Sequence, residues 1–172
     1  MKIALKKELT GSILDIGGGG EGIIGRLYGS RVTAIDNRQE ELDEAPDTCT
    51  KLCMDATALS FADESFDAVT AFYSLLFMTA GEQERAIAEG IRVLRPGGRL
   101  CLWDCAVESA YPDPFVTELD VDLEGELLHT SYGICKLDAQ ARESILSFCL
   151  TKGLTLLTSR QEGIHFYLEL QK

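Results

Sequence analysis

A glycine-rich turn between two apolar segments places the strongest constraint on the fold of this chain. The run Ser12–Ile16 is short and apolar, which is typical of a buried strand, and it contains one acid, Asp15. Four consecutive glycines follow, Gly17–Gly20, and apolar residues then recur at helical spacing from Ile23 onward. A strand, a glycine turn and a helix in this order bring the backbone close to a bound nucleotide, because glycine has no side chain to hold the ligand away. The segment therefore predicts a site for a nucleoside-containing cofactor.

A second apolar run supplies the acid that such a site needs. Val32–Asp36 reads as the next strand and ends in a carboxylate, which can accept hydrogen bonds from both ribose hydroxyls. Gly17, Gly19 and Gly22 satisfy the pattern G-x-G-x-x-G. From these residues alone, a nicotinamide dinucleotide and S-adenosylmethionine fit equally well, and a glycine turn used only for packing is the third interpretation.

Strand-like and helical segments alternate along most of the sequence. The alternation predicts an α/β fold with a doubly wound, mostly parallel seven-stranded sheet. The final two runs are joined only by residues 160–163, too few for a crossover helix, so the C-terminal strand should be antiparallel to its neighbours. The predicted strands are Ser12–Ile16, Arg31–Asp36, Lys51–Met54, Phe66–Phe72, Gly98–Asp104, Leu154–Ser159 and Ile164–Leu170, and the predicted helices are Glu21–Tyr28, Gln39–Glu44, Gly81–Leu94 and Asp138–Lys152, with Asp138 as the N-cap of the last.

One segment breaks the alternation. Between Glu108 and Lys136, two stretches, Val116–Leu123 and Leu127–Cys135, alternate apolar with polar residues on either side of Gly125-Glu126. We expect a β-hairpin-like insertion outside the main sheet, within a single domain spanning residues 1–172.

Composition and charge narrow the functional classes. The chain has 172 residues, 45% hydrophobic and 26% charged, in the range of ordinary globular domains, and no apolar run reaches the length of a membrane span. A formal net charge of −12 repels nucleic-acid backbones, so we expect no nucleic-acid partner and no membrane partner. The six cysteines lie mostly in apolar runs, which predicts buried free thiols and a cytoplasmic location. Their spacing predicts no metal site.

Several motifs together resemble those of class I S-adenosylmethionine-dependent methyltransferases. Ile-Leu-Asp-Ile-Gly-Gly-Gly-Gly at residues 13–20 is similar to the family's first motif, Val-Thr-Ala-Ile-Asp at 32–36 to its second strand, and Leu-Arg-Pro-Gly-Gly-Arg-Leu at 94–100 to the turn into its fifth strand. The stretch from Cys53 to Val69 resembles the segment between the third and fourth strands. The resemblance covers the chain from Ser12 to its end, apart from the insertion. It favours S-adenosylmethionine over a nicotinamide cofactor.

The resemblance implies roles for particular residues. Asp15 would lie near the methionine amino group of the cofactor, Asp36 would bind the ribose, and Asp55-Ala56 would contact adenine. The cofactor-binding residues that it implies are Asp15, Gly17, Gly18, Gly19, Asp36, Asn37, Asp55, Ala56 and Phe72. The sequence departs from the family at Glu21, where members commonly have glycine, and in having only about eleven residues before the first strand, where members have helices that cover the site. The insertion, a second subunit in a homodimer, or a partner could provide the lid.

The methyl acceptor is less constrained by the sequence. It should lie beyond the carboxyl ends of the strands, and methyl transfer by in-line displacement does not require a catalytic base. Candidates on the acceptor side are Tyr73, Trp103, Asp104, His129 and Tyr132, with core packing as the alternative for the large aromatic residues and an exposed strand position as the alternative for His129. We expect an enzyme that transfers a methyl group from S-adenosylmethionine to a small molecule. The alternatives are a non-catalytic module that binds the cofactor or supports a partner, and a protein-methylating enzyme.

Overall fold

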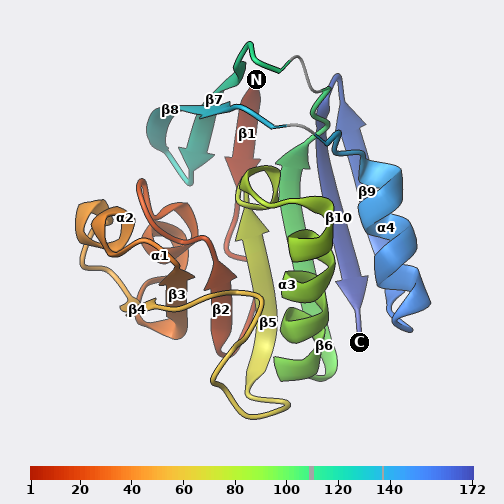
Figure 1. Cartoon of the computed structure of the whole chain (residues 1–172). Coiled ribbons are helices and arrows are strands. Elements are labelled where there is room, and N and C mark those ends of the chain that lie inside the picture. Colours follow the sequence, from red (N-terminus) through yellow and green to blue (C-terminus); the bar gives the residue numbers. More distant parts are fainter. Residues whose placement is uncertain (109–110, 137) are drawn as a thin grey trace.

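The computed structural model describes residues 1–108, 111–136 and 138–172, and forms two β-sheets flanked by helices (Figure 1). Ser109 and Ala110, inside the predicted insertion, lie outside the described residues. The strands are β1 (Lys2–Leu5), β2 (Ile13–Ile16), β3 (Val32–Asp36), β4 (Thr50–Cys53), β5 (Phe66–Phe72), β6 (Leu94–Cys105), β7 (Phe115–Leu123), β8 (Glu126–Ile134), β9 (Thr155–Glu162) and β10 (His165–Gln171). The helices are α1 (Ile23–Tyr28), α2 (Gln39–Glu44), α3 (Ala80–Val93) and α4 (Arg142–Thr151), with short 3-10 turns η1 (Gly29–Arg31) and η2 (Leu75–Phe77).

The main sheet has seven strands in the order β4-β3-β2-β5-β6-β10-β9. Its pairs are parallel except those that involve β10, which runs antiparallel to both β6 and β9. The predicted doubly wound sheet with an antiparallel C-terminal strand is therefore confirmed. The strand order reverses between β2 and β5, and ligands bind at such a reversal, beyond the carboxyl ends of the strands.

A hydrophobic core covers each face of this sheet. On one face, α3 and α4 contribute Ala86, Ile87, Ile145 and Cys149 to a cluster that includes Val69 and Leu100. On the other face, residues of α1 pack with β1 and with the inward side of β7. Figure 1 shows α3 and α4 side by side over β5, β6 and β10, while α1 and α2 lie near β2 and β3. None of the helices in the described ranges is both long enough and apolar enough to cross a membrane.

The predicted hairpin is present as β7 and β8, and it turns at Glu124 and Gly125, both with positive φ. It forms a second, three-stranded sheet with β1, which pairs in parallel with β7 from Lys2↔Asp120 to Leu5↔Leu123. β1 was absent from the expected elements, because four residues give too short a pattern and their partner strand lies more than a hundred positions away.

Two expectations about local structure were wrong. Asp138 does not cap the last helix, which begins at Arg142 after Ala141. Its carboxylate accepts a hydrogen bond from the Ala80 N–H at 2.8 Å, at the start of α3. The cysteines are all free, but they are not uniformly buried: Cys101, Cys105 and Cys149 are buried, whereas Cys53 and Cys135 are exposed. Strand periodicity placed the thiols in apolar runs without showing which face each one occupies.

Candidate active site

A cavity of about 800 Å³ lies beyond the carboxyl ends of β2, β3 and β5. All the residues to which the resemblance gives a cofactor role line it. Its remaining walls come from the loop after β5 and from β8, so the hairpin contributes directly to the site. The residues that line the cavity include Asp15, Gly17–Glu21, Asp36, Asn37, Arg38, Glu41, Glu44, Asp55, Ala56, Phe72, Tyr73, Ser74, Phe77, Met78, Glu82, Ser131, Tyr132 and Gly133.

The glycine turn forms one wall of the cavity, and two of its positions require glycine. Gly17 has φ of 73°, and a Cβ there would stand 2.3 Å from the Cβ of Ser74. A Cβ on Gly19 would stand 2.6 Å from the Cβ of Glu41. The N–H groups of Gly17 and Gly18 both donate to the carbonyl of Ile35, which holds the turn against the end of β3. The turn thus needs glycine because it lies in close contact with Ser74, which follows β5, and with Glu41 of α2.

Asp15 is buried at the base of this turn. Thr70 Oγ1 donates to its Oδ1 at 2.7 Å. Burial raises the pKa of Asp15 to about 7, against the opposing effect of this hydrogen bond and with help from the nearby charge of Asp36. A cationic neighbour would stabilise the ionised form of this carboxyl group and so lower its pKa.

Asp36 and Asp55 stand further along the cavity. Asp36 Oδ1 accepts from the Arg38 N–H at 3.0 Å, which turns the carboxylate toward the space between β3 and the glycine turn. Asp55 Oδ1 accepts from the Thr57 N–H at 2.8 Å, and this bond holds the pKa of Asp55 below its usual range. Both side chains line the cavity and are hydrogen-bond acceptors, which ribose hydroxyls and an adenine amino group would need.

The cavity is strongly acidic. Arg38 is its one basic lining residue among those described, and its guanidinium pairs with Glu41 at 2.9 Å. Such a lining favours a ligand that carries positive charge and disfavours the diphosphate of a dinucleotide. The acids are Asp15, Glu21, Asp36, Glu41, Glu44, Asp55 and Glu82.

The hairpin closes one side of the cavity. The buried Thr130 hydroxyl donates to the Glu21 carboxylate, so β8 is fastened to the glycine turn. Arg26 of α1 pairs with Glu126 at 3.1 Å and adds a second link. The departure from the family at Glu21 therefore has a physical role here, since a glycine could not accept the Thr130 hydrogen bond.

Aromatic side chains meet where the hairpin reaches the loop after β5. The rings of Tyr73 and Tyr132 stack at 5.3 Å with an interplanar angle of 9°. Phe77, which is 55% exposed, meets Tyr132 edge-on at 6.4 Å. Tyr73 has φ of 49°, an uncommon conformation for a residue with a side chain, and it turns its ring under the hairpin.

The structure separates the five acceptor-side candidates. Tyr73 and Tyr132 line the acidic cavity. Trp103 lines a second cavity on the sheet face below β1. Asp104 is fully buried and lines neither, because its carboxylate accepts from Gln140 Nε2 at 2.7 Å and from the backbone of Leu76 and Cys105. His129 is on the exposed face of the hairpin, 2.9 Å from Asp120.

Sequence reasoning missed Glu41, Phe77 and His165. Glu41 sits on α2 among other acids, and nothing in its spacing distinguishes it from a solvent-facing position. Phe77 and Met78 follow β5 in a segment that gave no periodic pattern. His165 begins the C-terminal strand, beside the carboxyl end of the neighbouring strand β6. The antiparallel direction predicted for the C-terminal strand implies this position. In the described ranges, no group of three His, Cys, Asp or Glu residues could hold a metal ion.

Comparison with known proteins decides the family. The family described as "Methyltransferase domain" matches residues 14–102, slightly more than half of the chain. The chain belongs to this methyltransferase family. The resemblance to class I S-adenosylmethionine-dependent methyltransferases is thereby confirmed, and the match spans the glycine turn, the acid of β3 and the turn into β6.

Individual methyltransferases agree with the assignment. The chain is 37% identical over 101 residues to the ubiquinone/menaquinone biosynthesis C-methyltransferase of Paracoccus denitrificans, covering 51% of this chain and 40% of that protein. It is 33% identical over 138 residues to the 27-O-demethylrifamycin SV methyltransferase of Amycolatopsis mediterranei, covering 73% and 49%. The chain thus spans half or less of the length of both relatives. A crystal structure of a SAM-dependent methyltransferase from Methanosarcina mazei has the same fold, with a TM-score of 0.65, 21% identity and coverage of 95% and 94%.

Proposed function

We propose that this chain is a methyltransferase that takes its methyl group from S-adenosylmethionine and passes it to a small molecule. The observation that carries the proposal is the acidic, glycine-lined cavity that β8 closes on one side. S-Adenosylmethionine supplies an electrophilic methyl group on a sulfonium centre. Asp15 would pair with the amino group, Asp36 with the ribose hydroxyls, and Asp55 with the adenine, which fixes the cofactor at three separate points.

The protein's part in the reaction is to position the cofactor and to exclude water. Methyl transfer is a displacement at carbon, so its rate depends on alignment more than on proton transfer. The Tyr73–Tyr132 stack and the side chains of Phe77 and Met78 would shield the transferred methyl group from solvent. Because β8 lies over this part of the cavity, a small acceptor would reach the methyl group more easily than a folded protein. The quinone-pathway and rifamycin relatives are also named for small molecules.

Transfer of label from methyl-labelled S-adenosylmethionine to a panel of small acceptors tests the proposal. An Asp36→Ala variant should bind S-adenosylhomocysteine about 10- to 100-fold more weakly, because it loses charge-assisted hydrogen bonds of roughly 1.5–3 kcal/mol. Glu40→Ala, in the following helix α2, is the matched control, since Glu40 is exposed and lies outside the cavity. Equal affinities for the two variants would remove Asp36 from the ribose role. No labelled product with any acceptor, despite tight cofactor binding, would favour a non-catalytic module.

A further inference from the structure

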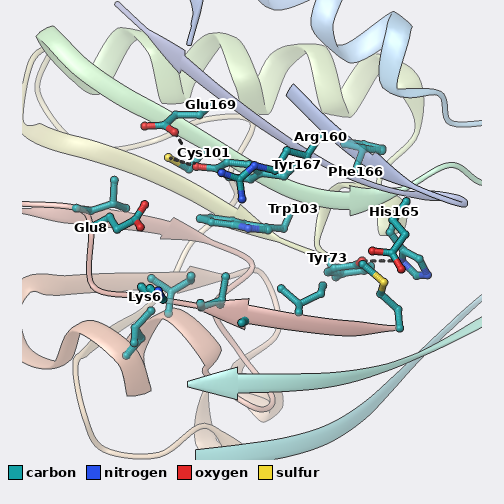
Figure 2. Close-up of a pocket in the computed structure, with 18 of the residues that line it drawn as sticks. Lys6, Glu8, Tyr73, Cys101, Trp103, Arg160, His165, Phe166, Tyr167 and Glu169 are labelled. Carbon is teal, nitrogen blue, oxygen red and sulfur yellow. Dashed lines mark hydrogen bonds between the residues drawn. The ribbon is translucent and has the colours of Figure 1, made fainter. Parts of the chain in front are cut away.

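A second cavity, of about 570 Å³, lies against β6 and β10, on the sheet face opposite α3 and α4 (Figure 2). Its size is within the range of sites that hold small organic ligands. One wall is the sheet, and the facing wall is the N-terminal segment with α1, which contributes the aliphatic residues Ile3, Leu5, Leu9, Ile24 and Leu27. The acidic cavity described above is a separate space.

The sheet wall presents aromatic faces. Trp103 of β6 and Tyr167 of β10 stack at 4.7 Å with an interplanar angle of 28°. At the far end, Arg99 pairs with Glu169 at 3.0 Å, and the Tyr167 hydroxyl donates to Glu169 at 3.2 Å. Arg99, Glu169 and the Tyr167 hydroxyl are thus paired with one another. The rest of the lining combines charged side chains, among them Lys6, Glu8 and Arg160, with the flat surface of the Trp103–Tyr167 pair, which suits a planar ring.

The other end carries a hydroxyl and an imidazole. Tyr73 Oη lies 2.7 Å from His165 Nδ1, and Figure 2 shows this pair at the end of the cavity away from Glu169. Burial lowers the pKa of His165, which keeps its ring neutral and able to accept a proton near neutral pH. A tyrosine hydroxyl that donates to a neutral imidazole can still accept a hydrogen bond from a ligand hydroxyl.

Tyr73 connects the two spaces. It is the one described residue that lines both cavities, and its ring stacks on Tyr132 in the wall of the acidic cavity. A ligand hydroxyl that meets the Tyr73–His165 pair would therefore lie at the boundary with the cofactor cavity.

We infer that the second cavity is the acceptor site and that it takes a planar aromatic molecule with a phenolic hydroxyl at the Tyr73–His165 end. This inference rests on the proposed methyltransferase function. In the reaction, the acceptor oxygen forms a bond to the methyl carbon while the carbon–sulfur bond of the sulfonium donor breaks, and the bonding pair stays on sulfur. The phenolic proton passes through the Tyr73 hydroxyl to His165 Nδ1 and from there to solvent.

Calorimetric titration with phenol and with naphthol, each compared with the corresponding saturated alcohol, tests ligand binding to this cavity without requiring methyl transfer. Naphthol should bind and decahydronaphthol should not. Ala4→Phe should weaken naphthol binding by about tenfold or more, because Ala4 is an exposed lining residue and the added ring would fill the space. Lys7→Phe is the matched control, since Lys7 is exposed in the same segment and lies outside the cavity. Neither change should alter affinity for S-adenosylhomocysteine.

Two different results would refute the acceptor site and the methyltransferase function. If S-adenosylhomocysteine binds but neither phenol does, or if Ala4→Phe binds naphthol as well as Lys7→Phe does, the acceptor site is wrong and the methyltransferase function stands. If S-adenosylhomocysteine does not bind, the proposed function fails, whatever the phenols do.

Proton transfer through the Tyr73 hydroxyl to His165 can be tested separately from ligand binding, by kinetics. Tyr73→Phe keeps the ring that stacks on Tyr132 but removes the hydroxyl, so kcat for naphthol methylation should fall about 10²-fold with KM unchanged. His165→Gln should lower kcat in the same way while naphthol and S-adenosylhomocysteine still bind. A change in KM alone would show that the pair only holds the ligand, and an unchanged kcat would refute the relay.

Discussion

Asp15 is the residue whose chemistry most directly reports on the cofactor. Its pKa is raised to about 7, first by burial, so in the free protein near neutral pH it is partly protonated. A cationic amino group beside it favours the ionised form. Binding should therefore release a proton, and the carboxyl should be the pH sensor of the site.

Cofactor affinity should consequently depend on pH with a definite sign. The pKa of the free protein lies near 7, so the ionised fraction, and with it the affinity for S-adenosylhomocysteine, should rise about tenfold between about pH 6 and about pH 8. Calorimetry across this range measures the effect. Asp15→Asn should bind more weakly and lose the slope. A slope that persists in Asp15→Asn would assign the pH dependence to another group.

Which residues meet at the cavity was predictable from the sequence where a local motif carries them. The acid two positions before the glycines, the acid ending the second strand and the Asp-Ala pair all line one cavity. Trp103, Asp104 and His129 show the limit of this reasoning. Position after a strand does not reveal which side of the sheet a side chain occupies, and that face decides whether it reaches a cavity, the core or solvent.

At the scale of elements, the hairpin is the distinctive part of the molecule. It supplies a wall that the short N-terminal segment does not, and it is held by the Thr130–Glu21 hydrogen bond. Its existence was predictable from alternating residues. Its contact with the glycine turn was not, because Thr130 and Glu21 are 109 positions apart and neither is unusual in its local pattern.

Thr130→Val should loosen the hairpin. The substitution keeps the shape of the side chain but removes the hydroxyl that bonds Glu21, at a cost of about 1 kcal/mol in the free energy of unfolding. S-Adenosylhomocysteine should dissociate faster, as stopped-flow measurement would show. Thr117→Val, at a buried threonine of β7 outside the cavity, is the control. Equal dissociation rates in both variants would mean that the hairpin does not retain the cofactor.

The start of α3, at one edge of the cavity, offers a test of stability. Thr79 and Glu82 form a reciprocal capping box, and Thr79→Ala should destabilise the protein by about 1 kcal/mol in urea unfolding. Thr79→Ser should restore most of the loss, because serine keeps the capping hydroxyl. Equal losses in the two variants would show that the methyl group of Thr79, not its hydroxyl, is what matters.

At the scale of the whole molecule, charge and fold point to the same cofactor. The net charge is −12, and the charged residues that line the cavity at the reversal of strand order are seven acids and one arginine. The mostly parallel sheet and its antiparallel strand followed from the alternation of strands and helices and from one short connection. The second sheet did not, because β1 pairs with β7, which lies more than a hundred positions away in the sequence.

The central claim is that the acidic cavity is built for a sulfonium nucleoside and not for a dinucleotide. Isothermal titration of the protein with S-adenosylhomocysteine and then with NAD tests it most directly. We expect saturable binding of S-adenosylhomocysteine with one site per chain, and no heat with NAD. Binding of NAD in place of S-adenosylhomocysteine would contradict the account.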